Sequence, residues 1–362
     1  MLYDLLYPLK DFWFGFNIFR YITFRAAMAS VTAFAFSVFI GPFVIRMLSH
    51  LKVSDSPRRE HVENLYQLHK HKEGTPTMGG IILMFAIVFS TVLWARLDNR
   101  FIIISLISVT WLGIIGFIDD YIKLIKIRSS GISATTKFLG QLVLGIGIAT
   151  YLYLDPEITT SLYIPFMKNA LFNLGLFYIV FVVLVIVGTS NAVNLTDGLD
   201  GLAIGCVTFI ALSYGIISYL TGHAEFSNYL NIYYLLGSGE LSVFCAVIAG
   251  SALGFLWFNS HPATVFMGDT GSLPLGGAIG VVSVLIKKEI LLLIVGGIFV
   301  AEAASVIIQV AAFKFFGKRV FLMTPIHHHF QLKGWPESKV TIRFWIVGVI
   351  LALFGLATLK VM

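Results

Sequence analysis

Long apolar runs separated by short polar segments extend along the whole chain. A helix that crosses a bilayer needs about 20 mostly apolar residues. By that criterion we predict ten spans, at residues 21–45, 77–96, 101–118, 137–154, 172–190, 200–220, 240–258, 272–286, 290–313 and 341–359. The pattern therefore predicts an all-α integral membrane protein that forms a single polytopic domain over residues 1–362.

The composition agrees with a membrane location. Of the 362 residues, 57% are hydrophobic and 12% are charged, whereas a soluble domain carries roughly 25% charged residues. Residues 1–20 mix aromatic and charged side chains and are interrupted by Pro8 and Gly15. We expect them to form a segment in the membrane interface rather than a span. They lack the basic start and compact apolar core of a cleavable signal peptide.

Basic residues are divided unevenly between the two predicted sides of the membrane. The loops after the odd-numbered spans, with their helix edges, carry 16 of the 25 lysines and arginines. Loops rich in lysine and arginine stay in the cytoplasm. We therefore expect these loops to be cytoplasmic and both termini to lie outside.

A polar stretch at residues 191–203 separates the fifth and sixth spans. It carries an asparagine or aspartate at every third position: Asn191, Asn194, Asp197 and Asp200. A three-residue step drifts by about 60° around a helix, so the four cannot share one narrow face. Gly198 and Gly201 instead predict a helix end, a tight turn and a new helix near Asp200. The alternative is a pair of capping residues between apolar segments.

Three more carboxylates fall at predicted cytoplasmic span ends. Asp119 and Asp120 end the third span, where adjacent carboxylates favour a cation or Lys123 beside them. Asp269 precedes the eighth span, and the glycines on either side of it, Gly268 and Gly271, suggest a turn that binds an anion or a metal ion. A solvated helix end and a helix-capping aspartate are the respective alternatives. Oxygen ligands without cysteine favour Mg²⁺.

Two further loops on the predicted cytoplasmic side carry candidate contacts. Residues 72–80, with Lys72 and Thr77, enter the second span through a glycine-rich segment whose amides could face an anion, or simply start a helix. His327, His328 and His329 do not have zinc-ligand spacing. An internal triple histidine is no expression tag, which favours a substrate contact over a solvated loop. In an extended chain the first and third histidines would share one face.

Glu302 lies deep within the predicted ninth span, where a carboxylate is costly and usually faces the protein interior. The sequence leaves open whether it supports a bend in that span or pairs with a neighbouring helix.

The ionisable groups gather at one membrane edge, beside the basic loops. A transporter more often places such groups near the bilayer midplane, on broken helices. The edge location suits chemistry between a water-soluble anionic substrate and a lipid-borne one. A lipid-phosphate or nucleotide-sugar transporter is the alternative from another class.

Five motifs then resemble those of a known family. In order and spacing, GTPTMGG, GFIDDYIK, NAVNLTDGLDGL, FMGDTGSL and PIHHHFQLKGW resemble the bacterial phospho-N-acetylmuramoyl-pentapeptide transferases, over residues 24–360. The wider superfamily of polyprenyl-phosphate N-acetylhexosamine-1-phosphate transferases shares the aspartate motifs. The triple histidine followed by Lys-Gly-Trp is specific to the muramoyl-pentapeptide branch and disfavours the alternative, a transferase for UDP-N-acetylglucosamine. Gln331 departs from the glutamate that many members carry.

This resemblance implies ten transmembrane helices in a bacterial inner membrane, with periplasmic termini and an active site on the cytoplasmic face. The implied reaction transfers phospho-MurNAc-pentapeptide from UDP-MurNAc-pentapeptide to undecaprenyl phosphate, with Mg²⁺, and gives lipid I and UMP. We expect a homodimer in the lipid bilayer and no nucleic-acid partner.

The resemblance also implies roles by motif position. Asp119, Asp120 and Asp269 are the expected catalytic residues, and Asp269 and Asp197 the expected metal ligands. The residues expected at the substrates are Lys72, Thr77, Lys123, Lys137, Asn194, Asp197, Asp200, Asn259, His327, His328 and His329.

Overall fold

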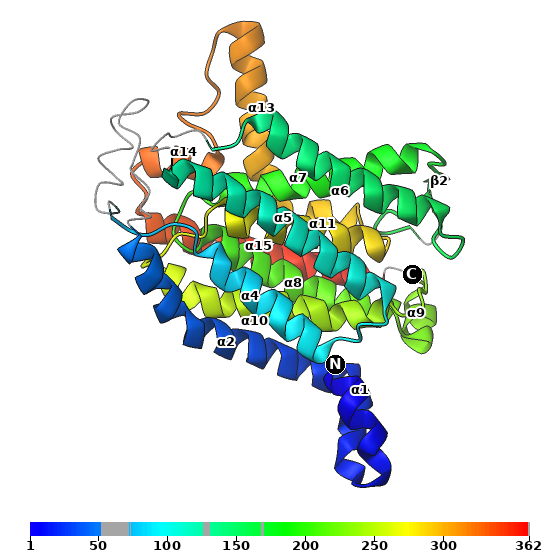
Figure 1. Ribbon diagram of the computed structural model, residues 1–362. Coiled ribbons are helices and arrows are strands. Elements are labelled where there is room, and N and C mark those ends of the chain that lie inside the picture. Colours follow the sequence, from blue (N-terminus) through cyan, green and yellow to red (C-terminus); the bar gives the residue numbers. More distant parts are fainter. Residues whose placement is uncertain (52–71, 73, 126–130, 168–169, 361–362) are drawn as a thin grey trace.

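The computed structural model describes residues 1–51, 72, 74–125, 131–167 and 170–360. Some of the basic loop residues counted above lie outside these ranges, namely Lys52, Arg58, Arg59, Lys70, Lys126 and Arg128. Helices make up most of the described structure and lie alongside one another in a bundle (Figure 1).

The long helices are α2 (Ile22–His50), α4 (Gly80–Trp94), α5 (Arg100–Ile125), α6 (Ala134–Leu154), α7 (Phe177–Thr196), α8 (Leu202–Thr221), α10 (Leu241–Asn259), α11 (Asp269–Leu285), α13 (Gly297–Phe316) and α15 (Glu337–Ala357). The short elements are α1 (Leu2–Leu6), η1 (Tyr7–Asp11), η2 (Phe14–Arg20), β1 (Ser161–Leu162), β2 (Phe172–Asn173), α9 (Ala224–Leu230), η4 (Ser238–Glu240), α12 (Leu291–Val295) and α14 (Ile326–Leu332).

A helix occupies each of the ten predicted span positions. Within the described ranges, eight helices are long and apolar enough to cross a membrane, and α4 and α11 are shorter apolar helices. The prediction of an all-α integral membrane protein is confirmed at this level. The antiparallel β1–β2 ribbon between α6 and α7 was not predicted, because two-residue strands carry too short an alternation to detect.

Helix α11 forms the centre of the bundle. Every residue from Thr270 to Leu285 is buried, and α11 packs mainly against α5 and α7. Its glycines permit this close approach: a Cβ at Gly276 would lie 2.5 Å from the backbone oxygen of Thr189. Small residues bring membrane helices together in this way. The arrangement places Asp269 at the end of the most enclosed helix.

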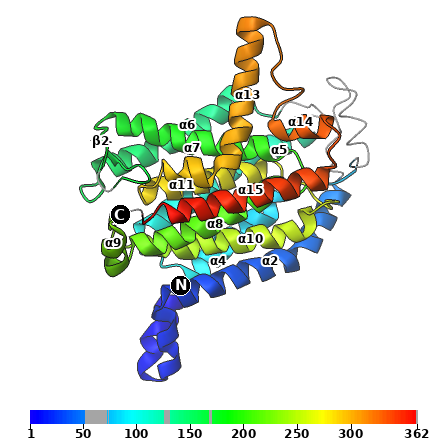
Figure 2. The same cartoon turned by 180° about the vertical axis from the view of Figure 1, so that it is seen from behind.

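The predicted span 290–313 is not one continuous helix. It is broken at Gly296 into α12 and α13, and α13 projects away from the rest of the bundle (Figure 2). A Cβ at Gly296 would lie 2.8 Å from the backbone oxygen of Leu292, so glycine suits the break. Apolarity alone does not reveal a break, because both halves are apolar.

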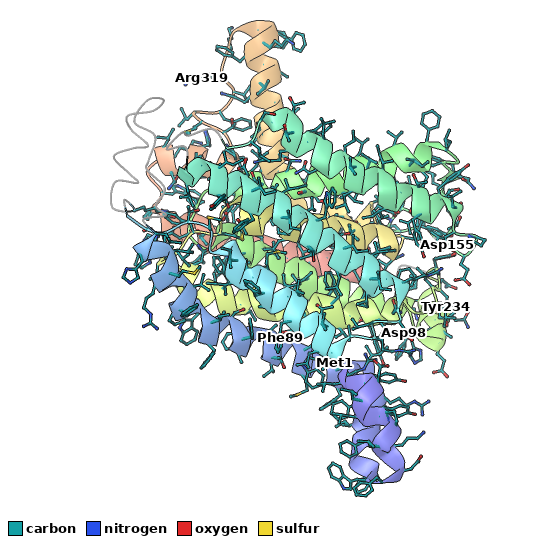
Figure 3. The ribbon with its side chains drawn as sticks, in the orientation of Figure 1. Met1, Phe89, Asp98, Asp155, Tyr234 and Arg319 are labelled. Atoms are coloured by element: carbon teal, nitrogen blue, oxygen red, sulfur yellow. The ribbon has the colours of Figure 1, made fainter. Side chains whose placement is uncertain are left out.

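The N-terminal segment also leaves the bundle, as Figure 1 shows for α1 and the turns after it. Phe12 and Phe14 are 90% and 83% exposed. Such exposed rings support the prediction of an interfacial segment. Asp98, Asp155 and Tyr234, labelled in Figure 3, mark the end of the bundle that carries β2 and α9.

Candidate active site

Asp119 and Asp120 at the end of α5 and Asp269 at the start of α11 form an acidic cluster. One carboxylate oxygen from each lies within 4.8 Å of the other two. The first two residues are only 1% and 4% exposed. Three carboxylates held so close together require positive charge beside them.

Two lysines supply that charge. The Lys123 ammonium, one helical turn beyond Asp119, lies 2.6 Å from Asp119 Oδ2 and 3.3 Å from both Asp120 Oδ1 and Asp269 Oδ2. Lys137 of α6 lies 3.2 Å from Asp119 Oδ2 and also pairs with Asp269. Two ammonium groups among three carboxylates leave one negative charge, so the cluster can accept a further cation.

Glycines allow α5 and the start of α11 to meet. A Cβ at Gly116 would overlap the backbone oxygen of Asp269. Gly268 has φ +71°, and a Cβ there would lie 2.6 Å from Asp120 Oδ2. In the space that remains, Asp120 Oδ2 accepts hydrogen bonds from the Thr270 backbone N–H at 2.9 Å and hydroxyl at 2.7 Å. The Thr77 hydroxyl lies beside the same glycine.

Helix α7 brings Asn194 and Asp197 to this centre. Asn194 Nδ2 donates to Asp269 Oδ1 at 2.6 Å and to Ser272 Oγ at 2.8 Å. The predicted helix, turn and new helix are confirmed: α7 ends at Thr196, Gly201 adopts φ +72°, and α8 follows. Asn191 faces another way and donates to Gln141.

Asp197 follows the last residue of α7. Its removal from water, together with the charges of Asp269, Asp120 and Asp200, raises the pKa of Asp197 to about 8. Its carboxylate receives no hydrogen bond from any described residue. Among the described residues, the group of carboxylates that Asp269 joins contains Asp119 and Asp120 and not Asp197.

Lys72 and Asp200 belong to a second group, which the sequence did not separate from the first. The Lys72 ammonium lies 2.7 Å from Asp200 Oδ1 and 2.5 Å from Glu337 Oε1. Asp200 Oδ2 lies 3.0 Å from His261 Nδ1 and accepts from the Ala263 N–H at 3.1 Å. Burial tends to raise the pKa of Asp200, but the hydrogen bond from Lys72 outweighs it, so this pKa is lowered.

Sequence reasoning missed Glu337 and His261. Glu337 Oε1 also accepts from the Asp200 N–H at 2.7 Å and so joins α15 to the turn before α8. Its only sequence signal, an acidic residue in the first turn of a helix, is shared by ordinary helix starts. Asn259 has a related role, because it accepts from the Gly201 N–H at 3.1 Å and donates to the Val265 carbonyl at 2.9 Å.

The three histidines lie in a helix, α14, and not in the extended chain in which the first and third would share a face. His327 is fully buried, with Nδ1 3.1 Å from Glu302 Oε1. Glu302 of α13 therefore pairs with a neighbouring helix, which answers the question that the sequence left open. A Cβ at Gly198 would overlap His327 Nε2, so this histidine packs on the turn beside Asp197.

The other two histidines stabilise α14 and the segment before it. His328 Nδ1 lies 2.8 Å from Gln331 Oε1. His329 Nδ1 accepts from the Leu322 N–H at 3.1 Å. The triple histidine therefore does not act as one unit in this structure: one member is buried under the Asp197 turn and two are only partly buried.

Fold and site together define a polytopic, all-helical membrane protein with a lysine-compensated acidic centre at one end of its bundle. The chain matches the profile of glycosyl transferase family 4 over residues 101–287 and a phospho-N-acetylmuramoyl-pentapeptide-transferase signature over residues 72–83. The signature contains Lys72 and Thr77, and the longer match contains the aspartates up to Asp269.

Full-length relatives specify the family. The chain is 52% identical to the phospho-N-acetylmuramoyl-pentapeptide-transferase of Desulforapulum autotrophicum, over 100% of both chains. It is 52% identical to that of Desulfotalea psychrophila, over 99% of both, and 50% identical to that of Endomicrobium trichonymphae, over 100% of both. The chain belongs to the phospho-N-acetylmuramoyl-pentapeptide-transferase family.

Proposed function

We propose that this protein transfers phospho-MurNAc-pentapeptide from UDP-MurNAc-pentapeptide to undecaprenyl phosphate, giving lipid I and UMP, the first membrane step of peptidoglycan synthesis. The observation that carries the proposal is the cluster of Asp119, Asp120 and Asp269 with two lysines among them. It occurs in a chain that is 52% identical, over its full length, to a relative named for the transfer of this group.

The chemistry needs positive charge at one phosphorus atom. An oxygen of the lipid phosphate attacks the sugar-linked phosphorus of the donor, and the bond from that phosphorus to the UMP oxygen breaks. Negative charge gathers on both sides of the reacting phosphorus, so ammonium groups held there stabilise the transition state. Lys123 and Lys137 supply this positive charge, and both are ion-paired to Asp119 and Asp269.

The donor set fits Mg²⁺, which prefers hard oxygen ligands and few protein carboxylates. Asp269, the most exposed of the three with a side chain 14% accessible, is the proposed principal ligand, with Asp119 and Asp120 beside it. Asp197 is a further proposed ligand, because burial and the charges of Asp269 and Asp120 together act on its carboxyl group and raise its pKa. When bound, Mg²⁺ would neutralise charge on the diphosphate of the donor.

Of the remaining predicted site residues, some are proposed to contact the substrates and others to hold the turns around them. Asn194, Thr77, His328 and His329 keep their proposed roles at the substrates. Lys72, Asp200, Asn259 and His327 already have partners within the protein, and we propose that they act at the substrates chiefly by holding the turns that surround the donor.

The orientation in the membrane is part of the same proposal. We propose a single polytopic domain in the bacterial inner membrane, crossing it ten times, with the acidic cluster on the cytoplasmic face, both termini in the periplasm and a homodimeric assembly. The predicted cytoplasmic loops and helix edges carry 16 of the 25 basic residues, which supports this orientation.

The test is purified protein with Mg²⁺, undecaprenyl phosphate and each UDP-sugar in turn, with UMP release as the readout. We expect release with UDP-MurNAc-pentapeptide and not with UDP-N-acetylglucosamine. Release with UDP-N-acetylglucosamine alone would identify the other transferase of the superfamily. Movement of a sugar nucleotide into vesicles without UMP release would identify a transporter.

A further inference from the structure

A cavity of about 60 Å³ lies at the end of the bundle away from the acidic cluster. It is enclosed by residues 163–167 after β1, residues 230–233 after α9, Lys288, and residues 358–359 after α15. In Figure 1 these segments meet on the right, near β2, α9 and the C-terminus. Helix α11 separates the two sites by its 17 residues, or about 25 Å at 1.5 Å per residue. The cavity is therefore distinct from the proposed active site.

Two neighbouring lysines in this region differ in their contacts with the described residues. Lys287 is fully buried, lies 3.1 Å from Glu289 Oε1, and lies 3.9 Å from the centre of the Tyr178 ring. Tyr178 donates its hydroxyl to the same glutamate oxygen at 3.2 Å. Glu289 is thereby matched by one lysine. The side chain of Lys288 makes no hydrogen bond or ion pair with any residue that the structure describes, and it lines the cavity.

The backbone around Lys288 is firmly held. Lys287 adopts φ +58°, which turns the chain out of α11. The Lys288 N–H donates to the Ser283 carbonyl at 2.8 Å, and its own carbonyl accepts from the Tyr214 hydroxyl at 2.9 Å. Burial lowers the pKa of Lys288 to about 8, which leaves most of this ammonium charged at neutral pH. The Lys288 side chain is only partly buried, and its ammonium makes no ion pair with a described residue, so it presents positive charge to the cavity and favours an anion there.

A second unpartnered donor lines the same cavity. The rings of Tyr163 and Tyr233 lie 5.6 Å apart. The Tyr233 hydroxyl donates to the Glu157 carbonyl at 2.9 Å, whereas the Tyr163 hydroxyl has no hydrogen-bond partner in the described part of the chain. Burial, with Tyr233 beside it, raises the pKa of Tyr163, so its hydroxyl keeps its proton.

We propose that this cavity binds a phosphate group, with the Lys288 ammonium and the Tyr163 hydroxyl as donors. The same chemistry is offered by inorganic phosphate and by the headgroup of an anionic lipid. The apolar lining, which includes Ile164, Phe166 and Leu291, favours the lipid. The proposal does not depend on the transferase reaction, because none of these residues lies at the acidic cluster.

The test uses the purified full-length protein in a neutral detergent and follows its thermal unfolding. Titrations of dioctanoyl phosphatidylglycerol, dioctanoyl phosphatidylcholine and inorganic phosphate are compared. We expect phosphatidylglycerol to raise the Tm of the wild-type protein saturably. Lys288→Gln should weaken that binding by about tenfold or more, since it removes a charge-assisted hydrogen bond. Tyr163→Phe should weaken it by about threefold to tenfold.

A matched control is available at the same end of the molecule. The Lys360 ammonium lies over the Tyr229 ring and does not line the cavity. Lys360→Gln should keep the wild-type affinity, and UMP release should be unchanged in all three variants. If Lys288→Gln does not fold, Tyr163→Phe provides the same comparison.

The outcomes separate the possibilities. Saturation by inorganic phosphate at the same concentrations, dependent on Lys288 or Tyr163, identifies free phosphate as the ligand. Equal shifts with phosphatidylcholine and phosphatidylglycerol, which both carry a phosphate, overturn the assignment to the headgroup of an anionic lipid. Equal shifts in the wild-type protein and in the folded cavity variants overturn the proposal.

Discussion

Asp269 is the residue on which the acidic cluster converges. Its Oδ2 faces both lysines, and its Oδ1 accepts a hydrogen bond from Asn194. Asp120, by contrast, is committed to Thr270 through two hydrogen bonds to one oxygen. The three carboxylates are therefore not equivalent, and the most accessible one is the metal ligand that we propose.

The first prediction concerns this residue. Asp269→Asn keeps the side-chain volume but removes the charge that Mg²⁺ needs. Losing one positioned electrostatic group costs roughly 3–4 kcal/mol of transition-state stabilisation, or about two to three decades in rate. We expect UMP release to fall by at least that factor, with normal membrane insertion and little recovery in excess Mg²⁺.

The matched control is Asp98→Asn, at an exposed aspartate far from the cluster (Figure 3), which should turn over normally. Ordinary turnover in Asp269→Asn at ordinary Mg²⁺ would instead place the metal at Asp119, Asp120 or Asp197.

At the scale of elements, short turns decide where the site residues lie. Gly268 starts α11 in a conformation that almost only glycine adopts, with φ +71° and ψ 178°. The turn between α7 and α8 needs Gly201 at φ +72°, and His327 of α14 packs on Gly198 in the same turn. Each of these proposed site residues is thus positioned by the end of a helix.

The second prediction tests the turn before α11. Gly268→Ala introduces backbone strain of about 1–3 kcal/mol and a Cβ 2.6 Å from Asp120 Oδ2. A misplacement of about 1 Å can reduce a rate about a hundredfold, so we expect UMP release to fall by at least tenfold. Gly147→Ala in α6 is the control, because a Cβ there meets nothing within 4 Å. Equal activity of the two variants would show that the turn tolerates a side chain.

At the scale of the whole molecule, a buried ion pair joins distant parts of the chain at the end opposite the acidic cluster. Arg25 near the start of α2 binds Glu240 of η4 through two hydrogen bonds, at 2.7 and 2.5 Å. The two residues are 1% and 5% exposed. The pair fixes α2 against α10, and these two helices share the most extensive helix contact of the described structure.

The third prediction is that removing one partner of the Arg25–Glu240 pair lowers the free energy of unfolding, because the other charge stays buried without a partner. Removing one partner of a buried pair costs about 3–5 kcal/mol, whereas replacing both by apolar residues is often neutral. We expect Arg25→Met to lower the free energy of unfolding by that amount, and Arg25→Met with Glu240→Leu to recover most of it. Unfolding in detergent measures both.

The control is the exposed pair of Arg96 and Asp98, whose side chains are 40% and 61% accessible. Asp98→Asn should change the free energy of unfolding by about 0–1 kcal/mol. A small effect of Arg25→Met, equal to that of Asp98→Asn, would mean that water reaches the Arg25 site.

The fourth prediction concerns orientation. A reporter fused after Met362 should be active only outside the cytoplasm, and one inserted between residues 314 and 340 only inside. This follows from the 16 of 25 basic residues on the predicted cytoplasmic side. The reverse pattern of activity would contradict the placement of the acidic cluster at the cytoplasmic face.

Much of the fold could be read from local pattern. A helix needs only its own residues to satisfy its backbone, so apolar runs located all ten predicted helices. Gly198 and Gly201 likewise predicted the turn between α7 and α8, because a turn with a left-handed residue needs glycine at that position in the sequence. The break at Gly296 was missed, since glycine within an apolar run is equally compatible with an unbroken helix.

The acidic cluster could be predicted in part, because the positions of its carboxylates along the chain are also a local property of the sequence. Asp119, Asp120 and Asp269 each lie at a span end, so their residue types and their gathering at one end of the bundle could be predicted from the sequence. Their pairing could not: Lys137 reaches Asp269 across 132 positions of the chain, and Lys72 reaches Glu337 across 265. Such contacts depend on which helices are neighbours, and that depends on side-chain packing, which no local pattern encodes.

Local sequence thus specified the helices, the turns that need glycine, and the polar residue types at the membrane edge. Only the tertiary structure separated Lys72 and Asp200 from the acidic cluster, buried His327 against Glu302, and placed Lys288 at the cavity with no ion pair to a described residue. The physical reason is that helix formation is satisfied within a segment. The partner of a charged side chain is instead chosen by the packing of the whole bundle.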